Sequence, residues 1–563
     1  MSFRLVQQPE PTEGSQPPDL QQPAGREHAT RFPWIPALLL LFFVLQSLWF
    51  IGTQSLVFDE PGHIYAGLES WQHGRFDMWV DQPPLGRYWF TLPLARAGVE
   101  IVQTSRDNLD YHVAEMRPGP QWLAWHTRPM NTLLGVALGL ALWFATRRLF
   151  SEGAANVALA LFVFTPSLIA HFSLATTDGI GALFIFLTAF QLVRWRSNPS
   201  WRQTFLMGII LGGLLLAKLY TPPEMVLALV VMLVVGRQRF LSQPRAWHWA
   251  AAAVAAVIAF LTFWAGYQFH HSHFSLHNGQ VVMTFPNRDT KTLPFPSSHQ
   301  VNLTLPGGEY LEGVRLVWVS NHVGRPTWFF GKLYPHGAPK TYFPAVIVLK
   351  WPTILLLLLF ASLVLGVRKT CRAPGDLLIM SLFGLVFLAF ALQSRITLGD
   401  RHLLPVYPFA LLIAGGIWEH ARRHRAAIAV LMLALCLNAA DALRYAPDYL
   451  SYFNVFVRPN SAWHLLTDSN LDWGQGLLAL RAYQQQHPDE VLHLAYFGSV
   501  DPRLYGIRAV PLAPNERMKG TIVVSASCLG GGLCGDGESY SWLSAYPPQK
   551  VLDHSMLVFN LTK

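Results

Sequence analysis

The chain has 563 residues, of which 52% are hydrophobic and only 13% are charged. A soluble surface needs roughly twice that charged fraction, so these values argue against a set of soluble domains and favour a membrane-embedded body with attachments. The formal net charge of +9 does not indicate a nucleic-acid partner, because the arginines stand in short loops between apolar runs.

The N-terminal residues 1–32 are rich in Gln, Pro and Glu and contain no apolar stretch long enough to pack. This composition predicts a disordered cytoplasmic tail. The first apolar run begins near Pro33 and ends near Leu56, after a basic start that resembles a signal peptide. Its length and the lack of a small-residue cleavage site predict an uncleaved membrane anchor instead.

Windows of roughly 20 apolar residues predict about eleven membrane spans. They lie near residues 34–55, 129–146, 154–173, 178–194, 203–219, 222–236, 248–268, 344–366, 376–394, 403–419 and 426–443. Clusters of basic residues follow every second window, at Arg147-Arg148, Arg194 to Arg202, Arg237 to Arg245, Arg368 to Arg372 and Arg422 to Arg425. With the N-terminus inside, every cluster is cytoplasmic, as the positive-inside rule requires.

This topology divides the chain into a membrane domain, residues 33–443, and an external C-terminal domain, residues 444–563. The membrane domain then carries two large external loops, residues 57–128 and 269–343. Strand-like runs alternate with a helical stretch, residues 477–486, in the C-terminal part, which predicts a small α/β fold. We therefore expect an all-α polytopic membrane protein with an external α/β domain in the periplasm.

Cys528 and Cys534 flank a glycine-rich stretch of this C-terminal part. If the segment lies outside the cytoplasm, a small loop disulfide is favoured. If it lies inside, the two residues are ordinary thiols.

Acidic residues occur where two predicted spans meet the external side. Asp59 and Glu60 follow the first span, and Asp178 begins the fourth. The ordinary explanation is helix capping with a solvated neighbour. The alternative is function, because unpaired carboxylates beside hydrocarbon are costly. Carboxylates that converge on one external cavity could act as a base, bind a metal or orient a sugar hydroxyl.

Four basic residues break the expectation that external span ends are poor in Lys and Arg: Lys218, Lys350, Arg395 and Arg401. Snorkelling towards the interface explains any one of them. Together they indicate an anion site at the outer leaflet, with phosphate as the obvious candidate. A group of three histidines, residues 270, 271 and 273, has a spacing that matches no zinc signature.

The order of several motifs resembles the GT-C glycosyltransferases. These motifs are the D-E pair after span one, a P-P-L turn, T-T-D before span four, a Lys after span five, and G-D-R-H-L-L-P-V-Y-P before span ten. The chain is most similar to the bacterial branch related to protein O-mannosyltransferases and to the lipid A aminoarabinose transferase, over most of residues 34–420. The tail motif D-S-N-L-D-W-G-Q-G-L, residues 468–477, resembles the tails of uncharacterised bacterial members.

The resemblance implies a phospholipid carrier-dependent glycosyltransferase, with a polyprenyl-phosphate sugar as donor and an inverting transfer to an acceptor hydroxyl on the external face. Asp59 matches the family's catalytic acidic position, Glu60 is expected to share or orient its work, and Asp178 matches a second carboxylate. Lys218 and Arg401 match positions that hold the lipid phosphate, and topology adds Lys350 and Arg395.

Three further residues in or beside the motifs are candidates for substrate binding: His63, Gln82 and His402. Gln82 departs from the family, whose members usually carry Lys or His before the P-P turn. A neutral amide can hydrogen-bond a phosphate or sugar but supplies no charge. Metal dependence varies in the class; no metal ligands are assigned, and a divalent metal stays open as a cofactor.

Alternative functions remain at this stage. A lipid-linked glycan polymerase or ligase would share the phosphate chemistry. A transporter or lipid flippase would need polar residues near the middle of spans, whereas these motifs cluster at outer ends. The expected partners are the lipid-linked donor and a lipid, glycan or protein acceptor in the bacterial inner membrane. The sequence identifies neither the sugar nor the acceptor.

Overall fold

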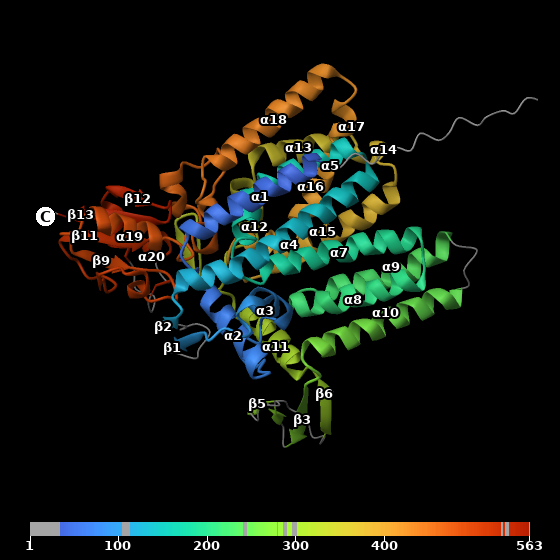
Figure 1. Ribbon diagram of the computed structural model, residues 1–563, viewed down its shortest axis with the longest axis horizontal. Coiled ribbons are helices and arrows are strands. Elements are labelled where there is room, and N and C mark those ends of the chain that lie inside the picture. Colours follow the sequence, from blue (N-terminus) through green and yellow to red (C-terminus); the bar gives the residue numbers. More distant parts are fainter. Residues whose placement is uncertain are drawn as a thin grey trace, which may run out of the picture.

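The computed structural model describes residues 34–103, 113–239, 245–277, 280–284, 290–294, 301–530, 533–534 and 540–561. It consists of a helical bundle with a small sheet domain at its C-terminal end (Figure 1). The predicted architecture, a polytopic helical protein with a C-terminal α/β unit, is confirmed.

Six described helices are long and apolar enough to cross a membrane: α1 (Trp34–Thr53), α4 (Pro120–Leu149), α7 (Asp178–Ser197), α10 (Arg245–Gly266), α15 (Pro374–Gln393) and α18 (Arg425–Leu443). A seventh span results if α12 (Tyr342–Lys350) and α13 (Thr353–Val364) count as one, although they are bent by 107°. The other predicted windows hold shorter helices, α5 (Glu152–Val163), α6 (Pro166–His171), α8 (Trp201–Ala217), α9 (Pro222–Arg239), α16 (Tyr407–Gly415) and α17 (Trp418–Ala421). Each predicted window therefore contains helix, but several spans are bent or short.

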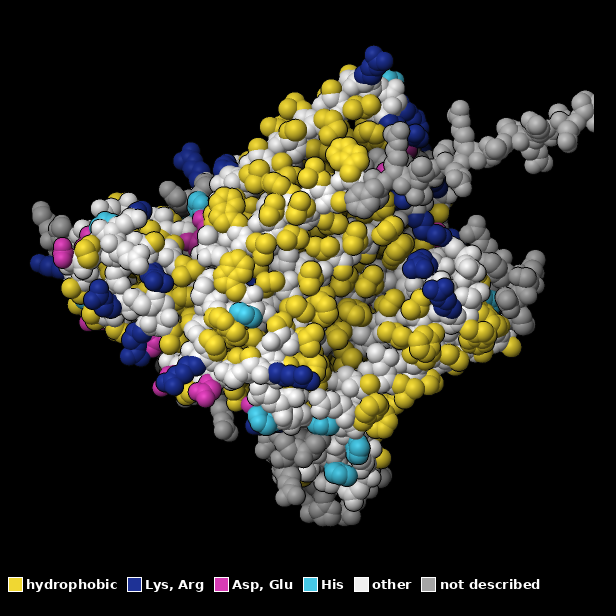
Figure 2. All heavy atoms as spheres, in the orientation of Figure 1, with side chains coloured by type: hydrophobic (Ala, Val, Ile, Leu, Met, Phe, Trp, Pro, Cys, Tyr) yellow, Lys and Arg dark blue, Asp and Glu magenta, His cyan; other side chains and the backbone are white. Residues whose placement is uncertain are grey.

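The surface of the bundle is apolar, as lipid contact requires. Large side chains on α1 and α18 are more than half exposed, among them Leu38, Leu41, Leu45, Val430 and Leu433. Figure 2 shows hydrophobic side chains covering much of the face formed by the helices, with Lys and Arg mostly near its margins. An apolar surface this extensive is not found on soluble monomers.

Loops that carry the basic clusters meet at one end of the bundle. Arg148 donates to Ser197, Arg196 Nε donates to Asp376 Oδ1 at 2.8 Å, and the backbone N–H of Arg372 donates to the Leu149 carbonyl at 2.8 Å. The short helix α14 (Val367–Thr370) and α17 lie on the right in Figure 1, and the C-terminal sheet lies on the left. The basic loops and the C-terminal sheet thus lie at opposite ends of the bundle.

The two large loops fold into small helices and sheets. The first contains α2 (Glu60–Gln72), α3 (Pro84–Thr91), and the antiparallel pair β1 (Glu100–Gln103) and β2 (Val113–Arg117). The second contains the antiparallel sheet β5-β4-β3-β6, formed by β3 (His271–His277), β4 (Gln280–Thr284), β5 (Thr290–Pro294) and β6 (Val301–Pro306). It continues through α11 (Gly308–Val323), β7 (Thr327–Phe329) and β8 (Lys332–Tyr334).

The C-terminal unit is a five-stranded mixed sheet in the order β10-β9-β11-β13-β12. Its strands are β9 (Leu492–Ala495), β10 (Ala509–Pro511), β11 (Gly520–Ser525), β12 (Lys550–Leu552) and β13 (Met556–Leu561). The helix α19 (Leu477–Gln486) falls on the predicted helical stretch, and α20 (Ala526–Leu529) follows β11. Cys528 and Cys534 form a disulfide in this unit.

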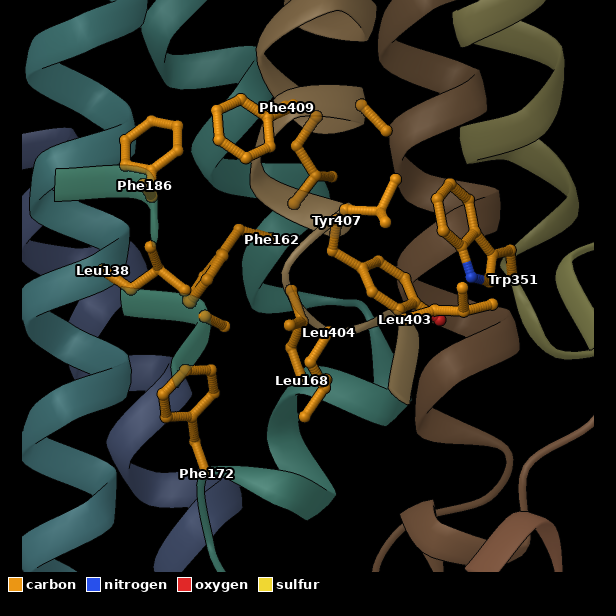
Figure 3. Close-up of a cluster of buried hydrophobic side chains, with 14 of the residues drawn as sticks. Leu138, Phe162, Leu168, Phe172, Phe186, Trp351, Leu403, Leu404, Tyr407 and Phe409 are labelled. Carbon is orange, nitrogen blue, oxygen red and sulfur yellow. The ribbon is translucent and has the colours of Figure 1, made fainter. Parts of the chain in front are cut away.

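The bundle core packs against the short segment that contains Asp400 and Arg401. Side chains from α4, α5, α6, α7 and α16 pack together in Figure 3, including Phe162, Leu168 and Phe186. At its edge Trp351 and Tyr407 stack with ring centroids 4.3 Å apart. Both donate to the buried carboxylate of Asp400, at 3.2 and 2.7 Å. This core fixes the one-turn helix η2 (Asp400–Leu403) that leads into α16.

Candidate functional site

Three ion pairs join four side chains at one end of the bundle. Arg401 Nη1 is 2.7 Å from Asp59 Oδ2 and 3.9 Å from Asp178 Oδ2. Lys218 Nζ is 2.9 Å from Asp178 Oδ1. These four side chains form one charged group, named here the ion-pair cluster. Its members come from four segments that are far apart in the sequence.

Each segment ends or begins a helix at this level. Asp59 precedes α2, Asp178 is the first residue of α7, Lys218 directly follows α8, and Arg401 lies in η2. Asp59 occupies the N-cap position of α2, but its side chain makes no capping hydrogen bond. The cap of α7 is Thr177. Helix capping therefore does not explain these two carboxylates.

Gln82 belongs to the ion-pair cluster through its side-chain oxygen. Gln82 Oε1 accepts from Lys218 Nζ at 2.9 Å and from the Thr177 hydroxyl at 2.7 Å. The P-P turn after it starts α3 at Pro84. The amide thus stands beside the cations, at the position where the resembled family usually has a cation.

Glu60 lies in a different environment from Asp59. Its carboxylate accepts from Arg128 Nε at 2.9 Å and Nη2 at 2.7 Å, and both side chains are fully buried. The backbone N–H groups of Val57 and Ala175 also donate to it, at 2.8 and 2.7 Å. Arg128 in turn donates to two backbone carbonyls of the residues that follow α1. Both Glu60 oxygens and all three Arg128 nitrogens therefore make hydrogen bonds inside the protein.

Two predicted phosphate ligands do not join the ion-pair cluster. Lys350 Nζ is buried and donates to the carbonyls of Leu450 and Asn470. Arg395 Nη1 donates to the His322 carbonyl at 3.1 Å, on the loop after α15. The structure thus brings together Lys218 and Arg401, and places Lys350 and Arg395 elsewhere.

His63 is buried and His402 is half-buried near the charged group. Burial lowers the pKa of His63 to about 4, against the opposing charge of Asp59. Burial and then the Arg401 charge lower the pKa of His402 to about 3. Both imidazoles are therefore neutral near pH 7. Among the described residues, both ring nitrogens of His63 and Nε2 of His402 have no hydrogen-bond partner.

Arg401 also contacts an aromatic residue that was not predicted to belong to the site. Its guanidinium lies over the Trp473 ring, 4.2 Å from the ring centroid. Burial lowers the pKa of Arg401, but Asp59 and Asp178 outweigh it and raise the value above its ordinary one. Its Nε is buried without a partner among the described residues. The tail motif around Trp473 was visible in the sequence, yet its contact with Arg401 was not.

Metal ligands are not assembled in the described part of the chain, where no group of three or more His, Cys, Asp or Glu side chains is arranged to hold an ion. His270, one of the three neighbouring histidines, lies 3.5 Å from Glu309. In the ion-pair cluster the carboxylates face Lys218 and Arg401, so the positive charge there comes from side chains.

Comparison with known proteins finds one matching family model and several similar solved structures. The model of the family described as dolichyl-phosphate-mannose-protein mannosyltransferase matches residues 123–264. No curated protein matches the chain. The S. cerevisiae protein O-mannosyltransferase Pmt1-Pmt2 complex bound to the sugar donor has a TM-score of 0.53 and 11% identity, over 74% of this chain and 89% of that chain.

Two further solved structures are similar at lower scores. ArnT from Cupriavidus metallidurans bound to undecaprenyl phosphate has a TM-score of 0.47 and 13% identity, over 93% of this chain and 97% of that chain. The oligosaccharyltransferase AglB from Archaeoglobus fulgidus has a TM-score of 0.44 and 12% identity, over 73% and 56%.

These findings confirm the predicted resemblance to GT-C class membrane glycosyltransferases. The matched family segment runs from α4 into α10 and includes Asp178 and Lys218. At 11% identity the yeast complex shows a common fold. The GT-C-like fold of this chain is therefore established, while donor and acceptor must be argued from the site.

Proposed function

We propose that the protein is an inverting glycosyltransferase that moves a sugar from a polyprenyl-phosphate donor to an acceptor hydroxyl on the external face of the membrane. The observation that carries this proposal is the ion-pair cluster, which sets two cations beside two carboxylates at helix ends. The matched family is described by a lipid-phosphate sugar, and this supports the same class of donor here.

The cations suit a lipid phosphate. Arg401 and Lys218 are both largely buried, with side chains 10% and 9% exposed. Fixed cations in such a site stabilise a leaving group that gains negative charge, without having to reorganise during the reaction. Arg401 Nε has no partner among the described residues, which leaves a guanidinium donor for a phosphate oxygen.

Asp59 is the candidate general base. It is the more accessible carboxylate of the cluster, with 19% of its side chain exposed against 5% for Asp178. The acceptor oxygen attacks the anomeric carbon while its proton passes to Asp59, and the bond from that carbon to the phosphate oxygen breaks. Polyprenyl phosphate leaves with the bonding electron pair beside Arg401 and Lys218. A single displacement of this kind inverts the anomeric carbon.

The other candidate residues have supporting roles or none in this proposal. Asp178 holds Lys218, and Gln82 fixes the same ammonium from the other side. His63 and His402, both neutral, offer hydrogen bonds to sugar or phosphate oxygens. Glu60 is assigned to the closed pair with Arg128, which holds the chain before Asp59 in place. Lys350 and Arg395 are not given phosphate contacts.

The basic loops support an external orientation of the site. The positive-inside rule favours a cytoplasmic position for their end of the bundle, which corresponds to an ion-pair cluster and a C-terminal sheet on the outer side of the inner membrane. The disulfide between Cys528 and Cys534 agrees with an oxidising compartment.

Incubation of the purified protein with defined polyprenyl-phosphate sugars and candidate acceptors tests the proposal. Mass spectrometry should detect free polyprenyl phosphate and a glycosylated product, and NMR should show an inverted anomeric centre. Release of polyprenyl pyrophosphate instead would indicate a polymerase or ligase acting on pyrophosphate-linked glycans. Movement of intact donor across proteoliposomes without its consumption would indicate a flippase and contradict the proposal.

A further inference from the structure

The tail segment, defined here as Thr467–Gln475, lies against the chain that carries Asp59. The backbone N–H of Phe58 donates to the Trp473 carbonyl at 2.9 Å, and that of Ser55 donates to the Gln475 carbonyl at 3.0 Å. These bonds tie a part of the chain beyond the last span to the residues between α1 and α2. The tail segment therefore forms part of the wall beside Asp59.

The same segment also contacts the chain that carries Arg401. Asn470 Oδ1 accepts from the backbone N–H of Asp400 at 3.0 Å. Gly399 has φ +129, and a Cβ at this position would lie 2.4 Å from Ser469 Oγ. Only glycine permits both this backbone conformation and so close an approach. The tail segment thus bridges the two halves of the Asp59–Arg401 pair.

Asp468 is the charged residue that this bridge brings to the site. Its φ of +56 is left-handed, a conformation that is uncommon for residues other than glycine and that clusters at functional sites. Its backbone N–H donates to Ser527 Oγ at 2.9 Å, and Ser527 is anchored by Asp472. The C-terminal sheet domain therefore holds Asp468 in a fixed position.

Asp468 lies within electrostatic reach of the reacting groups. Burial raises the pKa of its carboxyl to about 6, the Arg401 charge opposes that rise, and Asp59 adds to it. Among the described residues, Arg401 forms ion pairs with Asp59 and Asp178 but not with Asp468. The Asp468 side chain is only half-buried. Its Oδ1 accepts from the backbone N–H of Ser469 at 2.5 Å. The charges of Arg401 and Asp59 both act on its pKa without a direct ion pair in the described part of the chain.

We infer that Asp468 is a third substrate-binding carboxylate, which accepts a hydrogen bond from a ring hydroxyl of the donor's sugar. This inference rests on the proposed function. The sugar must lie between the phosphate at Arg401 and the acceptor oxygen at Asp59, and Asp468 belongs to the tail segment that contacts the chain on both sides of that space. A carboxylate with a free lone pair is a strong acceptor for a sugar hydroxyl. The C-terminal domain thus contributes to sugar recognition.

Asp468→Asn tests this role with little disturbance of the backbone, because asparagine tolerates a left-handed conformation. Two probes separate sugar contact from simple charge balance: undecaprenyl phosphate, and the undecaprenyl-phosphate sugar that wild type consumes in the transfer assay. The affinity of each lipid is measured for the full-length wild-type and Asp468→Asn proteins in detergent. Asp489→Asn, an exposed change in the same domain, is the matched control.

Asp468→Asn should weaken binding of the sugar-bearing lipid by about 10- to 100-fold, the loss expected for a charged hydrogen bond. Binding of undecaprenyl phosphate should stay equal or become tighter, because one negative charge near Arg401 is removed. Equal changes for both lipids, or none for either, would overturn the inference. If wild type consumes no donor in the transfer assay, the proposed function itself fails, which is a separate result.

Discussion

Asp59 and Glu60 are neighbours in the chain, and each carboxylate is paired with an arginine. Glu60 and Arg128 are both fully buried, and each makes two further hydrogen bonds to backbone groups. Asp59 and Arg401 are 19% and 10% exposed, and Arg401 Nε has no partner among the described residues. The Glu60–Arg128 pair is therefore saturated by contacts within the protein. The Asp59–Arg401 pair keeps an unused donor and some exposed surface, to which a ligand can bind.

We propose that this difference separates a structural ion pair from a reactive one. A closed buried pair is tightly held, and removal of one partner leaves an uncompensated charge. In a partly accessible pair with an unused donor, the arginine can bind a ligand with little loss of free energy. We therefore place the chemistry at Asp59 and Arg401, and assign Glu60 and Arg128 to holding the chain from which Asp59 projects.

The largest expected effect is that of Asp59→Asn on transfer. Asparagine keeps the size of the side chain but cannot take the acceptor proton, so the transfer rate should fall by about 10²- to 10⁴-fold. Initial rates of product formation with a fixed polyprenyl-phosphate donor provide the measurement. Membrane insertion and donor binding should be retained, and an unchanged rate would remove Asp59 from the mechanism.

Glu60→Gln should act on stability. It leaves the buried Arg128 charge without its partner, which costs about 3–5 kcal/mol of folding free energy. Unfolding of the detergent-solubilised protein measures this loss. Glu115→Gln is a matched control, because Glu115 pairs with Arg117 on the surface and such pairs contribute roughly 0–1 kcal/mol. A stable Glu60→Gln protein with lost activity would reverse the roles assigned to the two carboxylates.

Lys218→Gln and Arg395→Gln test which outer cations belong to the site. Loss of the Lys218 charge should raise the KM for the donor by about 10- to 100-fold, because a charged contact to phosphate disappears. Arg395→Gln should change it by less than about twofold, as for an ordinary surface substitution. Steady-state kinetics with varied donor concentration give the KM of each variant. Equal effects of both variants would show that the ion-pair cluster does not define the phosphate site.

The pH dependence of stability tests Asp472, a buried carboxylate that forms no ion pair in the described part of the chain. Burial raises the pKa of Asp472 to about 7. The folded state therefore keeps its proton between about pH 4 and pH 7 while the unfolded state has lost it. The free energy of unfolding should fall as pH rises through this window, by up to about 1.4 kcal/mol per pH unit. Thermal unfolding from pH 4 to pH 8 should show this slope, and Asp472→Asn should show a smaller one.

Much of the fold could be predicted because hydrocarbon imposes long apolar windows and loops follow the positive-inside rule. The window at residues 344–366 reads as one span, yet the chain turns by 107° between α12 and α13. Pro352 at this break cannot donate a backbone hydrogen bond. Beside this bend, Lys350 Nζ donates to carbonyls of the C-terminal part.

The site was predictable only in part. Asp59, Asp178, Lys218 and Arg401 all stand at the predicted outer ends of spans, and this shared position led us to group them. The partner of Glu60 could not be found in this way, because Arg128 is 68 residues away and reaches it through tertiary packing. The role of Trp473 was hidden for the same reason, since no sequence rule placed the tail motif against Arg401.

Binding of undecaprenyl phosphate to wild type, Arg401→Gln and Arg395→Gln tests the central claim most directly, because it does not depend on the identity of the sugar. The claim is that the ion-pair cluster holds the donor's phosphate. Wild type and Arg395→Gln should bind with the same affinity, and Arg401→Gln should bind at least about 10-fold more weakly. If folded Arg401→Gln bound the lipid phosphate as tightly as wild type, the ion-pair cluster would not be the donor site.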